Sequence, residues 1–246
     1  MPKASKAITG ARTSKDSILY IAVKELNPCA KDRAINDMVD DIKERIEGKN
    51  PAQTIEILKN ILEGLKPETM FEVLSQYASF IGKLYGKDVI LDDIDMQEIN
   101  YIKRADKDRE KLRKEFDSTE RENFIKNLAE KHEKELKEAG ITDEELLKMK
   151  DGLLPSKEWQ VHHKLPLDDG GTNAENNLVL IKNHPYHKVI TTHQNTIVAK
   201  QIEGKDECIV KFPIPPGNIY PPETREEFEK SIPVAKPKKK KKMKNK

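Results

Sequence analysis

The chain has 246 residues, of which 36% are apolar, 36% charged and only 5% aromatic. This balance is more polar than that of an average globular protein, and it favours long solvated helices with one compact module over a single large core. No apolar run approaches the roughly 18 residues that a membrane span needs, and residues 1–6 lead into no apolar segment. The sequence therefore indicates neither a membrane span nor a secretory signal peptide.

The formal net charge of +2 hides an uneven distribution, because eight of the eleven residues from 236 to 246 are lysine. The rest of the chain carries 37 basic and 43 acidic residues. A lysine run of this kind is disordered alone and attracts polyanions, so residues 223–246 are expected to form a basic disordered tail. Cys29 and Cys208 are far apart in sequence, and we expect two free thiols in a reducing compartment.

The N-terminal half is expected to be mostly helical. Residues 1–14 are small and basic and are predicted to be disordered, and helical spacing of apolar residues then runs to Gly86. Four helices are predicted: residues 17–26, residues 35–46, a third that begins at Pro51, and a fourth from Pro67 to Gly86. The fourth would bury Phe80, Ile81 and Leu84. Residues 15–86 are thus predicted to form a helical module without catalytic features.

Residues 87–139 are predicted to be a charged linker. A short bridge at 89–94 is followed by residues 97–139, which read as one or two long helices, and residues 107–122 have so few apolar side chains that they should be solvated. His132 stands between Lys131 and Glu133, and it is expected at the surface.

The chain changes character at Gly140. Thr142 and Glu145 have the spacing of a capping box, which predicts a short helix that ends near Gly152. Short strand-like runs and turns follow, and the proline-rich residues 212–222 must be extended.

Five of the six histidines fall within residues 162–193, and His162 and His163 are adjacent. Imidazole is the commonest metal ligand and exchanges protons near neutral pH. The pattern predicts a strand at 159–164, a turn at 168–173, a second strand at 177–181 and a helix from Pro185. Neighbours on a strand point to opposite sides. One histidine should therefore face the helix and share a metal with His187, and the other should face the substrate.

These residues resemble a known nuclease motif. The string from Trp159 through His162-His163, Pro166 and Gly170-Gly171 to Asn177, with His187 on the next helix, resembles the HNH, or ββα-metal, motif of colicin and pyocin DNases. It is similar above all to the C-terminal nuclease domains of bacterial polymorphic toxins of Rhs type. The resemblance covers residues 140–222 and implies an α+β fold, in which a mostly helical N-terminal half precedes a small HNH nuclease domain.

The resemblance also implies roles for single residues. His163 is similar to the general base that deprotonates the attacking water, and His162 and His187 resemble ligands of one divalent metal ion, Mg²⁺, Mn²⁺ or Zn²⁺. Asn177 resembles the asparagine that holds the loop and the base in register. The chemistry agrees with these residue types, because phosphodiester hydrolysis needs a base that works near neutral pH and a cation that stabilises developing charge.

The last metal ligand departs from the colicin pattern, because Thr191 stands four residues after His187, where a histidine is expected. His193 lies six residues on, about 240° round an ideal helix, and His184 precedes a proline, where helix geometry is disfavoured. Both stay open as ligands, His193 ahead of His184. Asp168 and Asp169 are read as turn residues because Gly170 and Gly171 follow them. Candidate phosphate contacts are Lys164, Lys182, Lys188 and the lysine tail.

The sequence thus predicts an endonuclease that cleaves DNA with little sequence specificity, because no base-reading motif accompanies the site. The resemblance implies a toxin made in a bacterial cytoplasm and secreted without a signal peptide, with a cognate immunity protein and the N-terminal half as a secretion-system adaptor. One alternative is a phage or restriction-type nuclease acting in its own cell, which would not kill a host that lacks an immunity gene. Another is a non-catalytic, zinc-stabilised nucleic-acid-binding protein, in which replacing His163 would leave metal and DNA binding intact.

Overall fold

The computed structural model describes residues 14–232 and divides the chain into two units, Met1–Ser79 and Phe80–Lys246. Of residues 1–14, which the sequence predicts to be disordered, Ser14 begins a helix and the others lie outside the described residues, as does the lysine run. Each unit has its own buried side chains. Among residues 14–232, none of the helices combines the length and apolar character needed to cross a bilayer.

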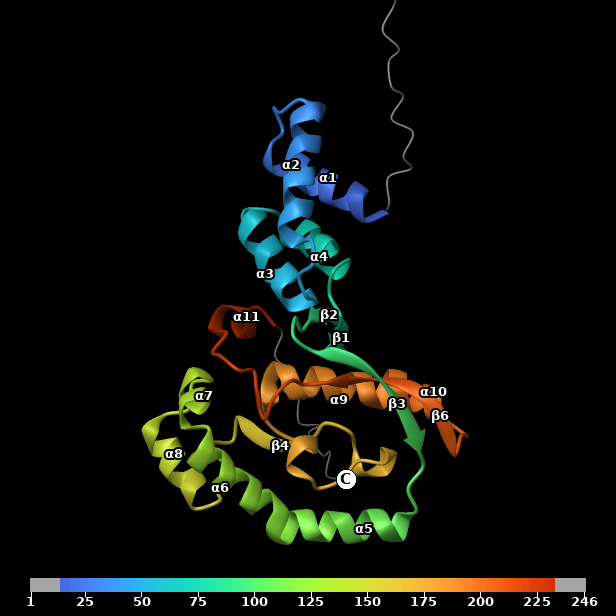
Figure 1. Cartoon of the computed structure of the whole chain (residues 1–246), viewed down its shortest axis with the longest axis vertical. Helices are drawn as coiled ribbons and strands as arrows, with labels where there is room; N and C mark the ends of the chain where they lie inside the picture. Colours follow the sequence, from blue (N-terminus) through green and yellow to red (C-terminus); the bar gives the residue numbers. More distant parts are fainter. Residues whose placement is uncertain (1–13, 233–246) are drawn as a thin grey trace, which may run out of the picture. The chain divides into compact units, whose positions relative to one another are not determined.

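Four helices form the first unit, as the sequence predicts: α1 (Ser14–Leu26), α2 (Asp32–Ile46), α3 (Pro51–Ile61) and α4 (Pro67–Ser75) (Figure 1). Apolar residues three and four apart form the buried face of each helix, with Ile35, Ile55 and Leu58 fully buried. Asn50 caps α3 by accepting a 2.9 Å hydrogen bond from the Gln53 amide.

The prediction that α4 continues to Gly86 is wrong. The helix ends at Ser75, and a hairpin follows, formed by β1 (Ile81–Leu84) and β2 (Lys87–Ile90). Tyr85 and Gly86 make its two-residue turn with φ of +50° and +81°, as the tightest hairpin turns require. The glycine that seemed to close a helix turns a hairpin instead, and Phe80 and Leu84 are buried in the second unit.

The prediction of helix from residue 97 is also wrong at its start. Residues Asp95–Ile102 form β3, which pairs antiparallel with β6 (Glu207–Ile214) along its whole length, beside α10 (Ala199–Ile202) (Figure 1). Its partner lies more than one hundred residues away in sequence, so local helical spacing could not reveal the pairing. The proline-rich segment is extended as predicted, in β6 and in β7 (Ile219–Tyr220).

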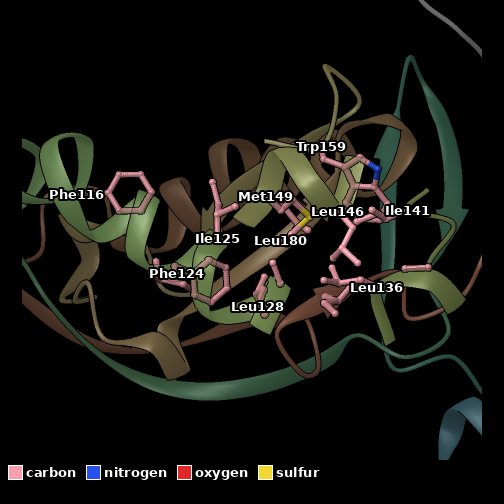
Figure 2. Packing of buried hydrophobic residues seen from close by; sticks show 14 residues of the cluster. Phe116, Phe124, Ile125, Leu128, Leu136, Ile141, Leu146, Met149, Trp159 and Leu180 are labelled. Carbon is pink, nitrogen blue, oxygen red and sulfur yellow. The ribbon is translucent and has the colours of Figure 1, made fainter. Parts of the chain in front are cut away.

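The charged helices are part of the second unit rather than a linker between domains. Helix α5 (Asp106–Glu115) buries none of its residues, as expected, but a π-helical turn (Phe116–Glu120) and α6 (Arg121–Lys131) continue it into a hydrophobic core. Figure 2 shows Phe124, Ile125 and Leu128 packed toward Met149 and Leu180. After α7 (Glu133–Glu138), the predicted capping box starts α8 (Asp143–Lys150).

A small sheet and a helix carry the histidines. Strand β4 (Trp159–His163) pairs antiparallel with β5 (Leu178–Lys182), which pairs parallel with β7. A short turn (Asn183–His187) leads from β5 into α9 (Lys188–His193), which continues through Gln194–Val198 into α10. Val179 and Ile181 on β5 pack with Val189 and Ile190 on α9. This order of strand, strand and helix agrees with the sequence prediction, and the chain as a whole is α+β.

The C-terminal tail begins later than predicted. Residues Glu226–Ser231 form α11, whose Phe228 lies 5.8 Å from Tyr186 between ring centroids. On the same helix, Glu229 accepts a 2.7 Å hydrogen bond from the Lys182 ammonium. The segment after residue 222 is therefore attached to the second unit, at least to Ile232.

Candidate functional site

A cavity of about 310 Å³ opens between β4, the loop that follows it, and α9. Its lining brings together three of the four histidines to which the sequence assigns the chemistry, with an arginine, a carboxylate and a hydroxyl beside them: His162, His163, His187, Arg113, Asp168 and Thr191. The cavity is thus polar, and its lining includes one arginine and one aspartate.

His162 and His187 face one another across the sheet-to-helix interface. Their ring centroids are 4.9 Å apart in an edge-on arrangement. Burial lowers the pKa of His162 to about 3 and that of His187 to about 4, and the positive charge of Lys188 adds to the shift of His187. Both imidazoles are therefore neutral at physiological pH, which is the form that binds a metal ion.

The Nε2 atom of His162 is buried and has no hydrogen-bond partner within the part of the chain that the structure describes. The Nε2 of His187 is 3.0 Å from the Thr191 hydroxyl, one helical turn on. The side-chain nitrogen of Gln194, which also lines the cavity, is buried without a partner as well. Buried polar atoms rarely stay unsatisfied, and a polar ligand in the cavity would satisfy these atoms.

His163 turns to different partners, as alternation along a strand predicts. It is 6% exposed, and its ring lies 4.5 Å from the Phe116 ring. Its Nε2 atom is 2.9 Å from the Oδ1 atom of Asn173. Burial lowers the pKa of His163, while the bond to Asn173 opposes that shift. The two adjacent histidines therefore have separate surroundings at one cavity.

Asn177 holds the loop after β4 in place. Its Oδ1 accepts a 2.9 Å hydrogen bond from the Leu165 amide, and its Nδ2 donates to the carbonyls of Leu165 (3.0 Å) and Thr172 (2.8 Å). One side chain thus closes the loop from both ends, which agrees with the register-keeping role that the resemblance implies.

The loop itself is a tight turn. Residues Leu167–Asp169 form a 3-10 turn that ends at Gly170 with φ of +92°, so Asp168 and Asp169 are turn residues as predicted. Gly171 leaves no room for a side chain, because a Cβ would collide with the Leu165 carbonyl. Arg104 donates to the carbonyls of Leu167 (2.8 Å) and Gly171 (2.7 Å), which braces the loop from outside.

The structure does not bring His193 to the site. Its ring packs edge-on against Phe80 at 5.1 Å, on the side of α9 that faces the β1–β2 hairpin. This geometry does not support His193 as a ligand of the same metal ion as His187, because six residues on a helix turn its ring to another side. His184 has non-helical backbone angles before Pro185, and it is not among the described residues that line the cavity.

The three predicted phosphate-binding lysines lie in different surroundings. Lys182 is at the far end of β5, in an ion pair with Glu229. Lys164 is half-buried beside His163, and burial lowers its pKa. Lys188 is exposed at the start of α9, directly after His187. None of the three lines the cavity, although the charge of Lys188 contributes to lowering the pKa of His187.

Three residues at the site were missed from the sequence. Arg113 and Phe116 come from the segment that the sequence predicts to be a solvated linker, and Asn173 comes from a predicted turn. Nothing in the local pattern distinguishes Arg113 from the other exposed basic residues of α5. Phe116 was the better signal, because an aromatic residue in a highly charged helix indicates a packing partner.

The donor atoms fit a metal site with few protein ligands. Among residues 14–232, no group of three or more His, Cys, Asp or Glu side chains is arranged to hold a metal ion. The cavity offers instead two neutral imidazoles, the unsatisfied Nε2 of His162 and the Thr191 hydroxyl. A cation held by two imidazoles would satisfy that nitrogen and leave positions for water and substrate oxygens.

A comparison with known proteins finds a relative for part of the chain. Over 151 residues it is 48% identical to the uncharacterized protein YhhZ of Escherichia coli (strain K12), a match that covers 61% of this chain and 37% of YhhZ. No family model matches the chain, and no solved structure matches it. The function is therefore argued from the site.

Proposed function

We propose that the second unit is a metal-dependent endonuclease that hydrolyses DNA phosphodiester bonds in this cavity, with an HNH-type arrangement of two strands and a helix. The observation that carries the proposal is the third imidazole. His163 shares the cavity with the His162–His187 pair but is not part of it, and it is oriented by Asn173. A purely structural metal site needs ligands only, whereas hydrolysis needs a base beside them.

His162 and His187 would hold one divalent metal ion. Bound there, the ion supplies positive charge that stabilises the charge developing on the phosphate oxygens and the leaving group. Neither imidazole competes with a proton near neutral pH, because burial keeps the pKa of each well below its usual range. Thr191, in the place of a further ligand, bonds to His187 and orients its ring.

His163 would accept the proton of the attacking water. Its lowered pKa keeps the ring neutral at pH 7, so the lone pair of the base is available. Arg113, exposed at the cavity, would bind a phosphate oxygen of the substrate through its fixed positive charge. Contacts of this kind recognise the sugar-phosphate backbone of DNA and not its bases, so cleavage should show little sequence preference. Delivery into other cells as a toxin remains a prediction from the resemblance.

The test is cleavage of supercoiled plasmid by the full chain with Mg²⁺, Mn²⁺ or Zn²⁺ added separately. Wild type should nick and linearise the plasmid with at least one of these ions, and chelation should stop the reaction. His163→Ala should lower the rate by about 10²- to 10⁴-fold, the usual contribution of a general base, while metal binding persists.

Matched variants separate the site from general effects. His132→Ala removes a partly exposed histidine that is bonded to Glu135 outside the cavity, and it should cleave like wild type. Arg113→Ala should weaken DNA binding, whereas Lys111→Ala, an exposed basic residue on the same helix, should not. Cleavage that survives His163→Ala would contradict the mechanism. Zinc binding without cleavage by the wild type would favour the structural-site alternative.

A further inference from the structure

The amide of Asn173 joins two elements that are far apart in sequence. Its Nδ2 donates a 2.9 Å hydrogen bond to the carbonyl oxygen of Leu112 on α5. Its Oδ1 lies 2.9 Å from the Nε2 of His163 at the end of β4. A single side chain thus connects the backbone of a helix with the ring of the proposed base.

This arrangement fixes which ring nitrogen carries the proton. A carbonyl oxygen can only accept, so the amide group of Asn173 must direct its NH₂ to Leu112. Its oxygen then faces His163, and because an amide oxygen can only accept, the Nε2 of His163 must donate. In the neutral ring the other nitrogen, Nδ1, therefore carries the lone pair.

Helix α5 and the turn after it hold this arrangement on a second side. Phe116 is 3% exposed and stacks at a tilt of 55° on the His163 ring, so it limits rotation of the imidazole. It begins the π-helical turn Phe116–Glu120, a local widening of the helix that is often found at functional sites. On the same face, Arg109 is 3.2 Å from the Asp168 carboxylate in the loop after β4.

We infer that Asn173 is the positioning residue for His163, and that, tethered to α5, it holds the imidazole in the Nε2–H tautomer so that Nδ1 is the proton acceptor. The catalytic part of this inference rests on the proposed nuclease function, whereas the tautomer itself does not. It also makes α5, which lies outside residues 140–222, a component of the site.

The tautomer can be measured directly from the ¹⁵N NMR chemical shifts of the histidine ring nitrogens. The full chain is labelled with ¹⁵N in its histidines, and the two ring nitrogens of His163 are assigned by comparison with His163→Ala at a pH where the ring is neutral. Wild type should show a protonated Nε2 and an unprotonated Nδ1. Asn173→Ala removes the acceptor, so the two nitrogens should move toward averaged shifts. Asn173→Asp keeps the acceptor that faces His163 but loses the donor to Leu112, so Nε2 should stay the protonated nitrogen.

Activity provides the second measurement. Asn173→Ala should lower kcat by about 10- to 100-fold and leave KM within about 2-fold, because the base is misplaced while substrate contacts remain. Asn173→Asp should recover part of the loss. Asn176→Ala changes an exposed asparagine in the same loop and should behave like wild type in both measurements.

Two results would overturn the inference: a protonated Nδ1 in wild type, or an unchanged tautomer in Asn173→Ala. The wild-type spectrum decides the first even if the alanine variant does not fold. If the wild type shows the expected tautomer but cuts no plasmid with any of the three metals, the proposed nuclease function is wrong. The positioning of His163 by Asn173 would still be supported.

Discussion

Burial of His162 should make the protein sensitive to acid. The folded-state pKa of about 3 lies below the ordinary value of 6.5, so the unfolded chain takes up this proton first. The free energy of unfolding should therefore fall as the pH drops below 6.5, by on the order of 1–2 kcal/mol between pH 7 and pH 5. His187 acts in the same direction. Urea unfolding of the metal-free protein across this range measures the slope.

The variant His162→Gln should show a shallower slope over the same pH range, because it removes the group with the largest cited shift. Equal slopes in wild type and variant would contradict the assigned burial. Among single residues, the sequence predicts that His162, His163 and His187 lie near one another, and they line one cavity, while Asn177 bonds the loop after β4. Asn173 and Arg113 could not be predicted, because their roles depend on contacts between α5 and the loop that follows β4.

We expect only one side of α9 to bind a metal ion, and metal titration of two variants can test this. His187 faces His162 at 4.9 Å, whereas His193 packs on Phe80. His187→Ala should abolish binding of Mn²⁺ or Zn²⁺ in isothermal titration calorimetry. His193→Ala should keep the affinity within about 3-fold and cost about 1 kcal/mol or more of stability through lost packing. If both variants lost metal binding, a metal ligand would also lie on the side of α9 that packs on Phe80, and the assigned site would be contradicted.

Elements were predictable where their signals are local. Strand β4, the turn at Gly170 and the capping box at Thr142 follow from neighbouring residues and were confirmed. The β1–β2 hairpin was missed because Leu84 and Gly86 also fit the end of a helix, and the choice depends on burial of Phe80 and Val89 in the second unit. Strand β3 was missed because β6, which satisfies its backbone, is remote in sequence.

Because the chain divides into two units at Ser79, the second unit alone should keep the site. Residues 80–246 contain the complete cores around Leu180 and Val179, so this fragment should unfold cooperatively and cleave plasmid as the full chain does. Residues 140–246, the extent of the nuclease resemblance with the tail, lack α5, α6 and β3. They would expose the surface that Phe124 and Leu128 cover and leave the edge of β6 unpaired. Circular dichroism during heating should show no cooperative transition for this fragment. If it folded and cleaved DNA, α5 would not be part of the site, and His163 would be positioned without the Phe116 ring or the bond from Asn173 to Leu112.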